Sequence, residues 1–591
     1  MNILGVSCYY HDAAAALLQD GMLVAAAEEE RFTRKKHDSG FPSHAIWFCL
    51  EHVGIEPREL DYVVFYEKPL TKFERVLTTA VSTFPRSAEM FREAMIAQFD
   101  DKLWIKSLLM SRLGLPGEKV LFVDHHMAHA ASAFFCSPFR EAAILTVDGV
   151  GEWTTATLGT ATADWDGLGV NSIRLTHEIR FPHSLGLLYS AFTAFLGFEV
   201  NEGEYKVMGM AAYGQPRYLD KVYKVVRVAD DGSIHVNMEY FSFHCSATRT
   251  FSPRFVELFG EPRDPNAEFI TPQMAPDLSG REAGVQACQY YADVAASIQR
   301  VTEDVLLKMA NHLQQETGLK ALCMAGGVAL NSVANGRIFR ETPFEDLFIQ
   351  PAAGDSGGAV GAAQYVWHVL LHQPRKFIMK HAYLGQGADE EEICDFLDQN
   401  NICYEVEEDE KLLPRLVDDL KAGKVIGWFQ GRFEWGPRAL GNRSILADPR
   451  RAEMKQIVNA KIKFREPFRP FAPMVPEKRA SEFFQGLSDP ARNYPARYML
   501  LVLPWKDPYG NLVPAVNHGG TGRLQTLRPE WNPRCYRLIE LFGEATGVPI
   551  LMNTSFNLRG EPIVGSPADA WSTFTNSGLD VLVMGNHVIR K

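Results

Sequence analysis

The sequence predicts an α/β protein whose N-terminal part is internally duplicated and whose C-terminal part is a separate unit. Two β-hairpin patterns separated by helical sequence, two later glycine-rich turns, and a change of composition near residue 375 predict this organisation. The chain has 591 residues, of which 46% are apolar and 22% are charged, as is ordinary for a globular protein. At roughly 150 residues per domain, this length indicates about two to four folding units.

The first copy of the duplicated element begins at the N-terminus. NILGVSC is apolar and β-prone, YYHD interrupts it, AAAALLQ resumes, and an Asp20-Gly21 turn leads into MLVAAA. The second copy comprises AAILTVD (142–148), the turn GVGE, WTTATLG and, after a longer excursion, GVNSIRLTHEI. Helical periodicity predicts helices at residues 43–54, 128–135, 184–198 and 294–315.

Two glycine-rich turns follow the second copy. KALCMAGGVALNS and DLFIQPAAGDSGGAVGAA each join an apolar strand to a helical pattern, and neither matches a P-loop or a dinucleotide-binding fingerprint. Taken alone, each is typical of tight packing between a strand and a helix. Together with the hairpins, they resemble the nucleotide site of the actin, sugar-kinase and Hsp70 superfold, in which phosphates lie between two hairpin turns.

A domain boundary is predicted at HQPRKFIMKHAYLGQG (372–387), where Pro, Gly and basic residues interrupt the periodic regions. We expect one domain at residues 1–372 and another at 383–591. The second concentrates Arg and Lys among aromatics and prolines, in WFQGRFEWGPRALGNRS and KIKFREPFRPFAP. Because so many packed cations need anionic partners, we predict a phosphate-binding pocket, with a solvated basic face as the alternative. Its candidate residues are Arg438, Arg443, Lys463, Arg465, Arg469, Arg523 and Ser555.

Charge and composition exclude some classes of function. The chain has 60 Lys and Arg against 72 Asp and Glu, a net charge of −12, which disfavours nucleic acid as a partner. No apolar run is long enough to predict a membrane span, and the N-terminus lacks the basic region of a signal peptide. Nine scattered cysteines without a C-x-x-C pair indicate reduced thiols. We therefore expect a cytoplasmic protein.

A candidate metal site begins at DHHMAH. His125 and His129 are four residues apart, so on a helix they share one face and could chelate one ion, whereas His126 points elsewhere. Asp148 and Asp355 each follow an apolar strand beside glycine turns, where turn-forming aspartates are also common. Two histidines and two aspartates would favour iron(II), manganese or zinc over calcium. A buried histidine pair bound to the backbone is the alternative.

Two further residues are candidates with simpler alternatives. His11 lies in the first hairpin turn, where it could act as a general base or be an ordinary surface histidine. Lys36, in EERFTRKKHDSGFP, is a charged loop residue or an anion contact if a cleft lies beside it.

The motifs along the chain resemble those of the O-carbamoyltransferase family, typified by the nodulation, tobramycin and cephem carbamoyltransferases. They extend from residue 3 to about residue 565. They include ILGVSCYYHDAAAAL, EERFTRKKHDSGFP, DHHMAHAASAF, VDGVGEW, NEGEYKVMGMAAYG, AGGVALN, WGPRALGNRSILADPR, KFREPFRPFAP and MNTSFNLRGEPIV.

This resemblance implies an ATP-dependent enzyme with two active sites. A C-terminal α+β, YrdC-like domain would make carbamoyl adenylate from carbamoyl phosphate and ATP, with Mg²⁺ accompanying the ATP. An N-terminal actin-like domain, similar to the threonylcarbamoyl transferase of tRNA, would move the carbamoyl group to a hydroxyl of a small-molecule acceptor in secondary metabolism. A homodimer is left open.

The resemblance also implies roles for individual residues. His125, His129, Asp148 and Asp355 match the metal ligands, usually of iron(II). His11 matches the base for the acceptor hydroxyl, and Lys36 a contact to the adenylate. Arg438 and Lys463 are expected to be catalytic in adenylate formation. The remaining expected substrate and nucleotide contacts are Gly326, Gly327, Asn331, Arg443, Arg469, Arg523 and Ser555.

One segment departs from the family pattern H-V-D-G-T-A-R. Here it is His518-Gly519-Gly520-Thr521-Gly522-Arg523, one residue shorter and without the aspartate. Arg523 is expected to keep its role. Two other functions stay open: a small-molecule kinase or ATPase of actin-like fold, which would produce ADP rather than AMP, and a protein that only binds nucleotide.

Overall fold

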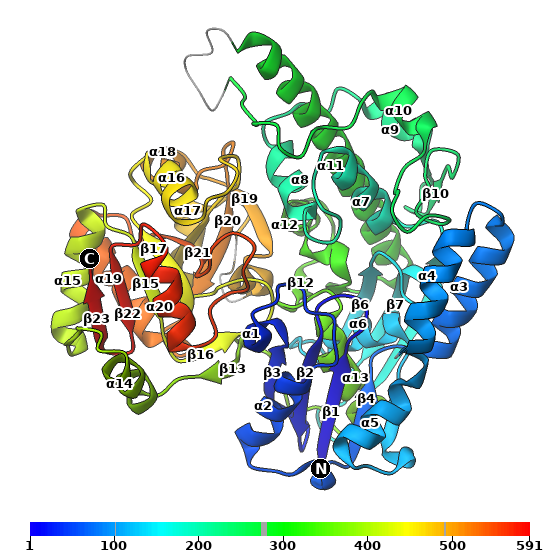
Figure 1. The fold of residues 1–591 in the computed structure, drawn as a ribbon, viewed down its shortest axis with the longest axis horizontal. Helices are drawn as coiled ribbons and strands as arrows, with labels where there is room; N and C mark the ends of the chain where they lie inside the picture. Colours follow the sequence, from blue (N-terminus) through cyan, green and yellow to red (C-terminus); the bar gives the residue numbers. More distant parts are fainter. Residues whose placement is uncertain (101, 273–280, 488, 490–491) are drawn as a thin grey trace. The chain divides into compact units, whose positions relative to one another are not determined.

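The computed structural model describes the whole chain except residues 101, 273–280, 488 and 490–491. It divides into two compact units (Figure 1). The first comprises Met1–Val24 and Ser39–Ile378, and the second comprises Ala25–Asp38 and Met379–Lys591. The prediction that the two halves are separate catalytic domains stays a prediction.

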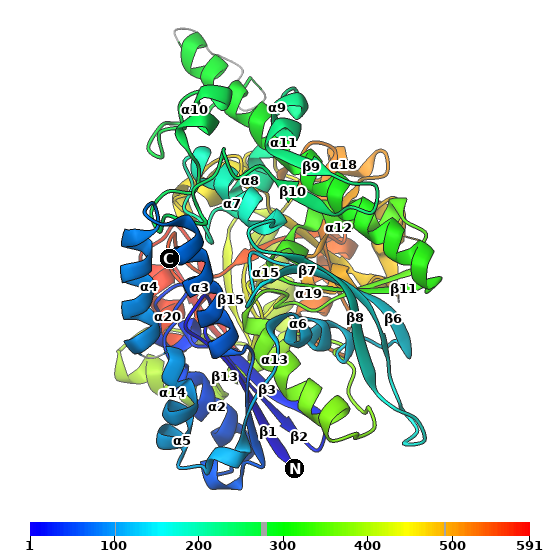
Figure 2. The ribbon, with the colours of Figure 1, turned by 90° about the vertical axis from the view of Figure 1, so that its right-hand side faces the viewer.

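Two five-stranded sheets in the first unit have the same topology. Their strand orders are β3-β2-β1-β4-β5 and β12-β11-β6-β7-β8. Counted in chain order within each sheet, the first strand pairs antiparallel with the second and parallel with the fourth. The fourth pairs parallel with the fifth. The first sheet contains β1 (Asn2–Ser7), β2 (Ala14–Gln19), β3 (Met22–Glu28), β4 (Tyr62–Phe65) and β5 (Val120–Phe122). The second contains β6 (Glu141–Val147), β7 (Thr154–Thr162), β8 (Ser172–Arg180), β11 (Ala321–Ala325) and β12 (Asp346–Ile349), and Figure 2 shows β6, β7 and β8 side by side.

This repeated topology confirms the predicted duplication, the α/β class and the actin-like architecture of the N-terminal part. The predicted strands and the Asp20-Gly21 turn are present, with Gly21 at φ +84°. The predicted helix at 294–315 is part of a longer helix, α11 (Glu282–Thr317). The other helices of this unit are α2 (Ser43–Val53), α3 (Pro69–Thr83), α4 (Ala88–Asp100), α5 (Ile105–Leu113), α6 (His125–Phe134), α7 (Leu185–Phe195), α8 (Glu204–Ala211), α9 (Leu219–Val225), α10 (Pro253–Phe259), α12 (Ser332–Glu341) and α13 (Ser356–Tyr365).

Helices α6 and α13 pack closely because small residues line their contact. A Cβ atom at Gly361 of α13 would lie 1.8 Å from the carbonyl oxygen of Ala128 in α6. A Cβ at Gly5 of β1 would lie 1.8 Å from the carbonyl oxygen of Ala359. Only glycine allows backbones to approach so closely. The glycines of GDSGGAVG therefore set the spacing of two helices that carry candidate site residues.

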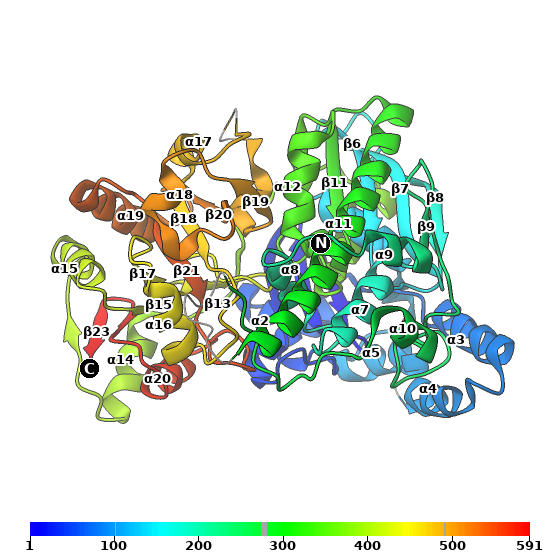
Figure 3. The ribbon, with the colours of Figure 1, turned by 90° about the horizontal axis from the view of Figure 1, so that it is seen from above.

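The second unit is built on a nine-stranded mixed sheet of order β14-β23-β22-β15-β17-β21-β18-β20-β19. Helices α15 (Asp409–Lys421) and α19 (Pro533–Thr546) pack together (Figure 3) and share an apolar core with the sheet that includes Leu416, Trp428 and Phe542. The strands are β14 (Glu405–Val406), β15 (Ile426–Phe429), β17 (Arg443–Ala447), β18 (Ala472–Pro476), β19 (Leu501–Pro504), β20 (Thr521–Leu527), β21 (Leu551–Ser555), β22 (Val581–Met584) and β23 (His587–Arg590). Helix α20 (Pro567–Thr575) packs on β15 and β22.

Residues 25–38, which we call the strap, belong to the second unit although they come early in the chain. The strap contains the end of β3 and the short helix α1 (Glu30–Thr33). Its charged residues Glu28 and Arg31 are each only 4% exposed. In the described part of the chain, no helix is both long enough and apolar enough to cross a bilayer.

Candidate active site

Four predicted metal ligands lie together in the first unit. His125 and His129 are one turn apart on α6, Asp148 follows β6, and Asp355 immediately precedes α13. One ligand atom from each residue lies within 4.8 Å of all the others. None of the four residues is more than 7% exposed.

The spacing of these atoms suits one shared cation. Nε2 of His125 lies 3.0 Å from Nε2 of His129 and 3.1 Å from Oδ2 of Asp148, and Oδ1 of Asp355 lies 3.7 Å from both Nε2 atoms. Atoms bound to one ion at about 2.1 Å are separated by roughly 3.0 to 3.4 Å. Within the described residues, Oδ2 of Asp355 is buried without a hydrogen-bond partner, which a cation would compensate. This group could therefore hold a metal.

Electrostatics in the cluster also favour a bound positive charge. Burial opposes protonation of His129, but the carboxylates of Asp148 and Asp355, which lie 3.8 and 3.7 Å from its Nε2, outweigh it and raise its pKa to about 9. Burial alone would raise the pKa of Asp148, yet His125 and His129 hold it well below its usual range. The Asp148 carboxylate thus stays ionised in a dry site, where a proton or a metal ion must balance it.

His126 faces away from this cluster, as its position on the helix predicts. Its Nδ1 lies 2.7 Å from Oγ1 of Thr146, and its Nε2 lies 2.9 Å from the carbonyl oxygen of Thr154. Burial, followed by the nearby charges of His125 and His129, lowers its pKa to about 3. His126 is therefore a neutral residue that joins α6 to the second sheet.

The first predicted glycine turn touches the cluster directly. The backbone N–H of Gly327 donates to Oδ1 of Asp148 over 2.8 Å. Gly326 has φ +94°, and a Cβ there would lie 2.2 Å from the carbonyl oxygen of Val147, so this position requires glycine. The side chain of Asn331 accepts the N–H of Ala334 over 3.1 Å and caps α12. The role of these three predicted residues in nucleotide binding stays a prediction.

His11 lies between β1 and β2 and is oriented by its neighbour. Its Nδ1 is 2.7 Å from Oδ2 of Asp12, and its side chain is 22% exposed. Burial lowers the pKa of His11, but the hydrogen bond with Asp12 and the charges of Asp12, Asp355 and Glu204 raise it to about 9. A carboxylate that fixes an imidazole in this way is a common feature of catalytic bases.

A second group of predicted residues lies on one face of the sheet in the second unit. Nδ2 of Asn553 donates to the carbonyl oxygen of Ala439 over 3.0 Å, and Nε2 of Gln525 donates to that of Leu440 over 2.8 Å. Alternate residues of a strand share a face, so Arg523 lies on the face of Gln525, and Ser555 on the face of Asn553. The loop at residues 436–440, which carries Arg438, covers this same face.

Lys463 extends this group. Its side chain is 3% exposed, and Nζ donates to the carbonyl oxygen of Ser555 over 2.8 Å, to Oγ of Ser555 over 3.2 Å, and to the carbonyl oxygen of Asn557 over 2.9 Å. Burial holds the pKa of Lys463 well below its usual range, and the nearby charges of Arg465, Arg469 and Lys36 lower it further. These cations are therefore close enough to repel one another. A bound anion would relieve that repulsion.

Arg443 has a different environment from the other predicted cations. It is fully buried over the ring of Phe429, with Cζ 3.7 Å from the ring centroid. Its guanidinium donates to the carbonyl oxygens of Gln430 and Gly431. Burial lowers its pKa to about 10. The structure thus shows Arg443 holding a main-chain turn, and its role as a substrate contact stays a prediction.

Glu434 is a residue of this site that sequence reasoning missed. Its Oε1 accepts the backbone N–H groups of Leu440, Asn442 and Arg443 over 2.7, 2.8 and 3.2 Å. The residue is 2% exposed. It therefore fixes the C-terminal end of the loop that carries Arg438.

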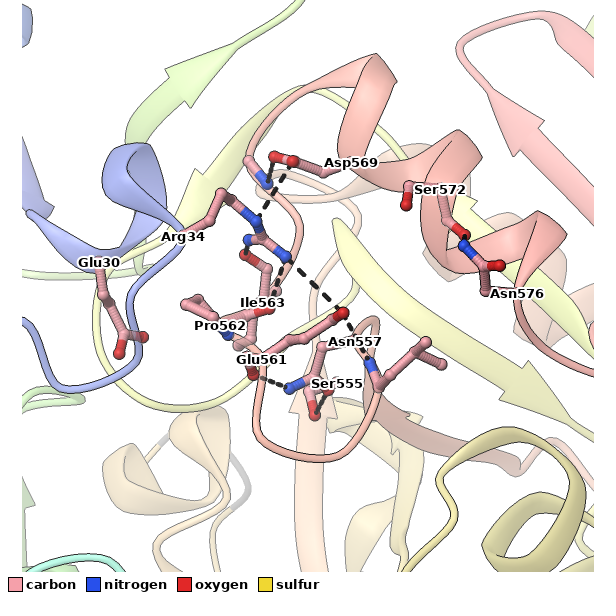
Figure 4. A network of polar contacts seen from close by, with 12 residues as sticks. Glu30, Arg34, Ser555, Asn557, Glu561, Pro562, Ile563, Asp569, Ser572 and Asn576 are labelled. Atoms are coloured by element: carbon pink, nitrogen blue, oxygen red, sulfur yellow. Dashed lines mark hydrogen bonds and ion pairs between the residues drawn. The ribbon is translucent and has the colours of Figure 1, made fainter.

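The strap holds two loops that border the sheet face of Arg523 and Ser555, which together with Arg438 and Lys463 we call the basic face. At the first, Oε1 of Glu28 accepts the N–H of Gly436 over 2.8 Å, and Nη2 of Arg31 donates to the carbonyl oxygen of Gly436 over 2.8 Å. At the second, Arg34 donates to the carbonyl oxygens of Ile563 and Pro562 over 2.7 and 3.1 Å, and its Nε lies 3.2 Å from Asp569 (Figure 4). This docking brings Lys36 near Lys463. Its sequence signal was the high charge of EERFTRKKHDSGFP, which equally describes an exposed loop.

The shortened segment forms a two-residue hairpin turn that leads into β20. The N–H of His518 donates to the carbonyl oxygen of Thr521 over 2.8 Å, and the reverse bond is 3.1 Å. Gly519 and Gly520 have φ +59° and +83°, the positive values that such a turn requires at both central positions. The turn therefore places Arg523 within β20 even though the family's aspartate is missing.

Comparison with known proteins gives matches over nearly the whole chain. The family model described as carbamoyltransferase N-terminus matches residues 2–364, and that described as carbamoyltransferase C-terminus matches residues 417–591. The uncharacterized protein sll1178 of Synechocystis sp. is 45% identical over 100% of this chain and 97% of its own. Nodulation protein NolNO of Sinorhizobium fredii is 36% identical over 99% of this chain and 79% of its own.

Solved structures give only a distant match. Component A of the (R)-2-hydroxyglutaryl-CoA dehydratase of Acidaminococcus fermentans covers 62% of this chain and 97% of its own, at 14% identity and a TM-score of 0.31. A likeness of this size transfers no function to the chain.

Proposed function

Because the chain belongs to the carbamoyltransferase family, we propose that it is an ATP-dependent O-carbamoyltransferase that acts in two steps. In the first step, water hydrolyses carbamoyl phosphate to carbamate and inorganic phosphate, and a carbamate oxygen attacks the α-phosphorus of ATP to give carbamoyl adenylate and pyrophosphate. In the second, the carbamoyl group moves to a hydroxyl of a small molecule, and AMP leaves. The observation that carries this proposal is the basic face formed by Arg438, Arg523, Ser555 and Lys463.

The basic face suits the first step because both substrates carry several phosphate charges. Guanidinium groups bind phosphate oxygens with two parallel hydrogen bonds, and Lys463 supplies a fixed charge whose position Ser555 and Asn557 hold. A preorganised set of cations in a partly dry site stabilises charge that develops on transferring groups. Lys36 of the strap would add to this field.

His11 suits the second step. With Nδ1 held by Asp12, its other ring nitrogen would take the proton of the acceptor hydroxyl as that oxygen attacks the carbamoyl carbon. In the protein without ligands, the pKa of about 9 keeps His11 protonated at neutral pH. Asp355 contributes to this raised pKa, so a cation that neutralises Asp355 would lower it and favour the basic form.

His125, His129, Asp148 and Asp355 would hold a divalent metal ion, for which we propose iron(II). Such an ion would supply Lewis-acid neutralisation of phosphate oxygens at the transfer site. The adjacent Gly327 N–H and the closely packed helices α6 and α13 keep these four side chains in place.

The full-length chain tests both steps. It should convert ATP to AMP and pyrophosphate with carbamoyl phosphate, and add one carbamoyl group to a hydroxylated acceptor detected by mass spectrometry. We expect Arg438→Ala to abolish pyrophosphate release and His11→Ala to spare it while blocking transfer. Arg537→Ala, on an exposed part of α19, is the matched control.

Three results would contradict this proposal. Formation of ADP instead of AMP would identify a kinase or ATPase of actin-like fold. Absence of any ATP cleavage would favour a protein that only binds nucleotide. Equal loss of both steps in His11→Ala would refute the assignment of the two steps to different residues.

A further inference from the structure

A second group of buried cations lies in the first unit, beside the first hairpin turn. Helix α3 carries Lys72 and Arg75, which are 7% and 9% exposed. The turn η2 (Lys102–Trp104) packs against α3 and contributes Lys102. None of these cations belongs to the basic face of the second unit or to the metal cluster.

Arg75 is nine-tenths buried but has no acceptor for its guanidinium. Among the described residues it forms neither a hydrogen bond nor an ion pair, and its Nη1 is completely buried without a partner. Among the described residues, its guanidinium makes one cation–π contact, with the ring of Phe181, whose centroid lies 5.2 Å from Cζ. Leaving a buried guanidinium without an acceptor costs several kcal/mol, so the position is explained best if a ligand supplies one.

Among the described side chains, three cations, Lys72, Arg75 and Lys102, lie near two carboxylates, Glu67 and Glu152. Lys72 is paired with Glu67 over 2.6 Å and lies over the ring of Tyr10, with Nζ 4.9 Å from the centroid. Burial lowers the pKa of Lys102, and the charge of Lys72 lowers it further. Glu67 interacts electrostatically with all three cations, but within the described residues only Lys72 forms an ion pair with it.

The other nearby carboxylate is already used. Glu152 is close enough to Arg75 to interact electrostatically, but its Oε1 accepts the backbone N–H of Lys68 over 2.8 Å and that of His125 over 3.1 Å. This second bond links the cationic group to the metal cluster, because His125 is the first residue of α6 and a candidate metal ligand. Tyr10, the neighbour of His11 in the chain, is 38% exposed and lies at the edge of the group.

We propose that Arg75, Lys72 and Lys102 form a subsite for an anionic group, a carboxylate or a phosphate, of the molecule that the first unit carbamoylates. The role in carbamoylation rests on the proposed function, whereas anion binding does not. The same chemistry would suit the phosphate of the adenylate. The acceptor is favoured because the His/Asp cluster already provides a cation site for the adenylate phosphate. The acceptor class is then a hydroxylated acid, such as a uronic acid or a sugar phosphate.

Calorimetric titration of the full-length protein with inorganic sulfate tests the subsite. We expect about two sulfate sites in the native protein, one of which is lost in Arg75→Gln and the other in Arg438→Ala. Arg92→Gln, which removes an exposed arginine from the neighbouring helix α4, should retain both sites. Lys102→Gln is a second variant in case Arg75→Gln fails to fold, and it should weaken the first-unit site by about tenfold, or about 1.4 kcal/mol.

Competition in the Arg438→Ala protein, which keeps only the first-unit site, distinguishes the two sources of the anion. Displacement of sulfate by galacturonate, but not by galactose or AMP, would support an acidic acceptor. Displacement by AMP would assign the anion to the adenylate and overturn the acceptor assignment. Unchanged sulfate binding in folded Arg75→Gln and Lys102→Gln proteins would overturn the subsite itself. Failure of the proposed function would be seen separately, as absence of pyrophosphate release in the native protein.

Discussion

Replacing Arg34 by methionine should release the strap from the second unit. Methionine keeps much of the length and apolar surface of the side chain but removes every donor. The substitution deletes the hydrogen bonds to the carbonyl oxygens of Pro562 and Ile563 and the ion pair with Asp569 (Figure 4). Because Lys36 follows two residues later, we expect it to lose its position near Lys463.

The size of the effect follows from these contacts. A hydrogen bond from a charged donor contributes roughly 1.5–3 kcal/mol, so two give about 3–6 kcal/mol. The Arg34 side chain is 27% exposed and that of Asp569 is 20% exposed, so water compensates part of this loss. We therefore expect strap docking to weaken by about 3 kcal/mol, equivalent to an opening equilibrium about 150-fold larger.

Hydrogen exchange measured by mass spectrometry on peptides covering residues 25–38 reports this opening directly, because local opening limits exchange in the native state. Lys35→Met is the matched control, since the Lys35 side chain is 71% exposed and pairs only weakly with Asp38, at 3.5 Å. Pyrophosphate release should fall in Arg34→Met and remain normal in Lys35→Met.

Equal exchange in the two variants would refute the conclusion that Arg34 holds the strap. Faster exchange together with unchanged pyrophosphate release would show that the strap docks as described but contributes nothing to adenylate formation.

Three other substitutions test the metal cluster, the histidine and the Arg438 loop. Gly361→Ala should weaken iron(II) binding about tenfold or more, because a methyl group 1.8 Å from the Ala128 oxygen must push α6 and α13 apart. Calorimetric titration with iron(II) measures this, with Gly284→Ala as the control. Asp12→Asn should move the pKa of His11 from about 9 toward 6.5, seen by NMR of labelled histidine. Because the folded pKa is raised, the pair's stabilisation is complete below about pH 6.5 and is lost as the pH rises through about 9; an unchanged pKa would contradict the role of Asp12. Glu434→Gln should slow pyrophosphate release about tenfold, because three N–H groups lose a charged acceptor, and a normal rate would show that the loop needs no such anchor.

Sequence reasoning predicted those parts of the fold whose signals are local. The apolar, β-prone runs and the Asp20-Gly21 turn predicted β1 to β3, and the similar pattern after residue 141 predicted the second copy. The spacing of His125 and His129 placed both on one face of a helix. That Asp148 and Asp355 meet them depends on the packing of α6 against α13, which glycines permit but no local pattern encodes.

The strap shows why other parts could not be predicted. Charged residues are seldom buried unless paired, so the segment EERFTRKKHDSGFP equally indicated an exposed loop. Arg31 is instead buried, paired with Glu30 over 3.0 Å, and both Glu28 and Arg31 bond the backbone of Gly436, which is 408 and 405 residues away. Loop geometry likewise decides that Glu434 accepts three backbone N–H groups and that Arg443 is buried against main-chain carbonyls. The sequence showed only that cations and aromatics are concentrated there.

The strap also affects how the protein must be synthesised. Arg34 is 529 residues upstream of Ile563, to which it donates. At roughly 5–20 residues per second, the ribosome needs about 30 to 100 s to synthesise the chain from Arg34 to Ile563. During this time the first unit can complete its sheets, while Arg34 in the strap still lacks Pro562, Ile563 and Asp569. A nascent chain arrested before residue 436 should therefore have a folded first unit with a protease-sensitive segment at residues 29–38, which becomes fully protected only when residues 562–569 are made.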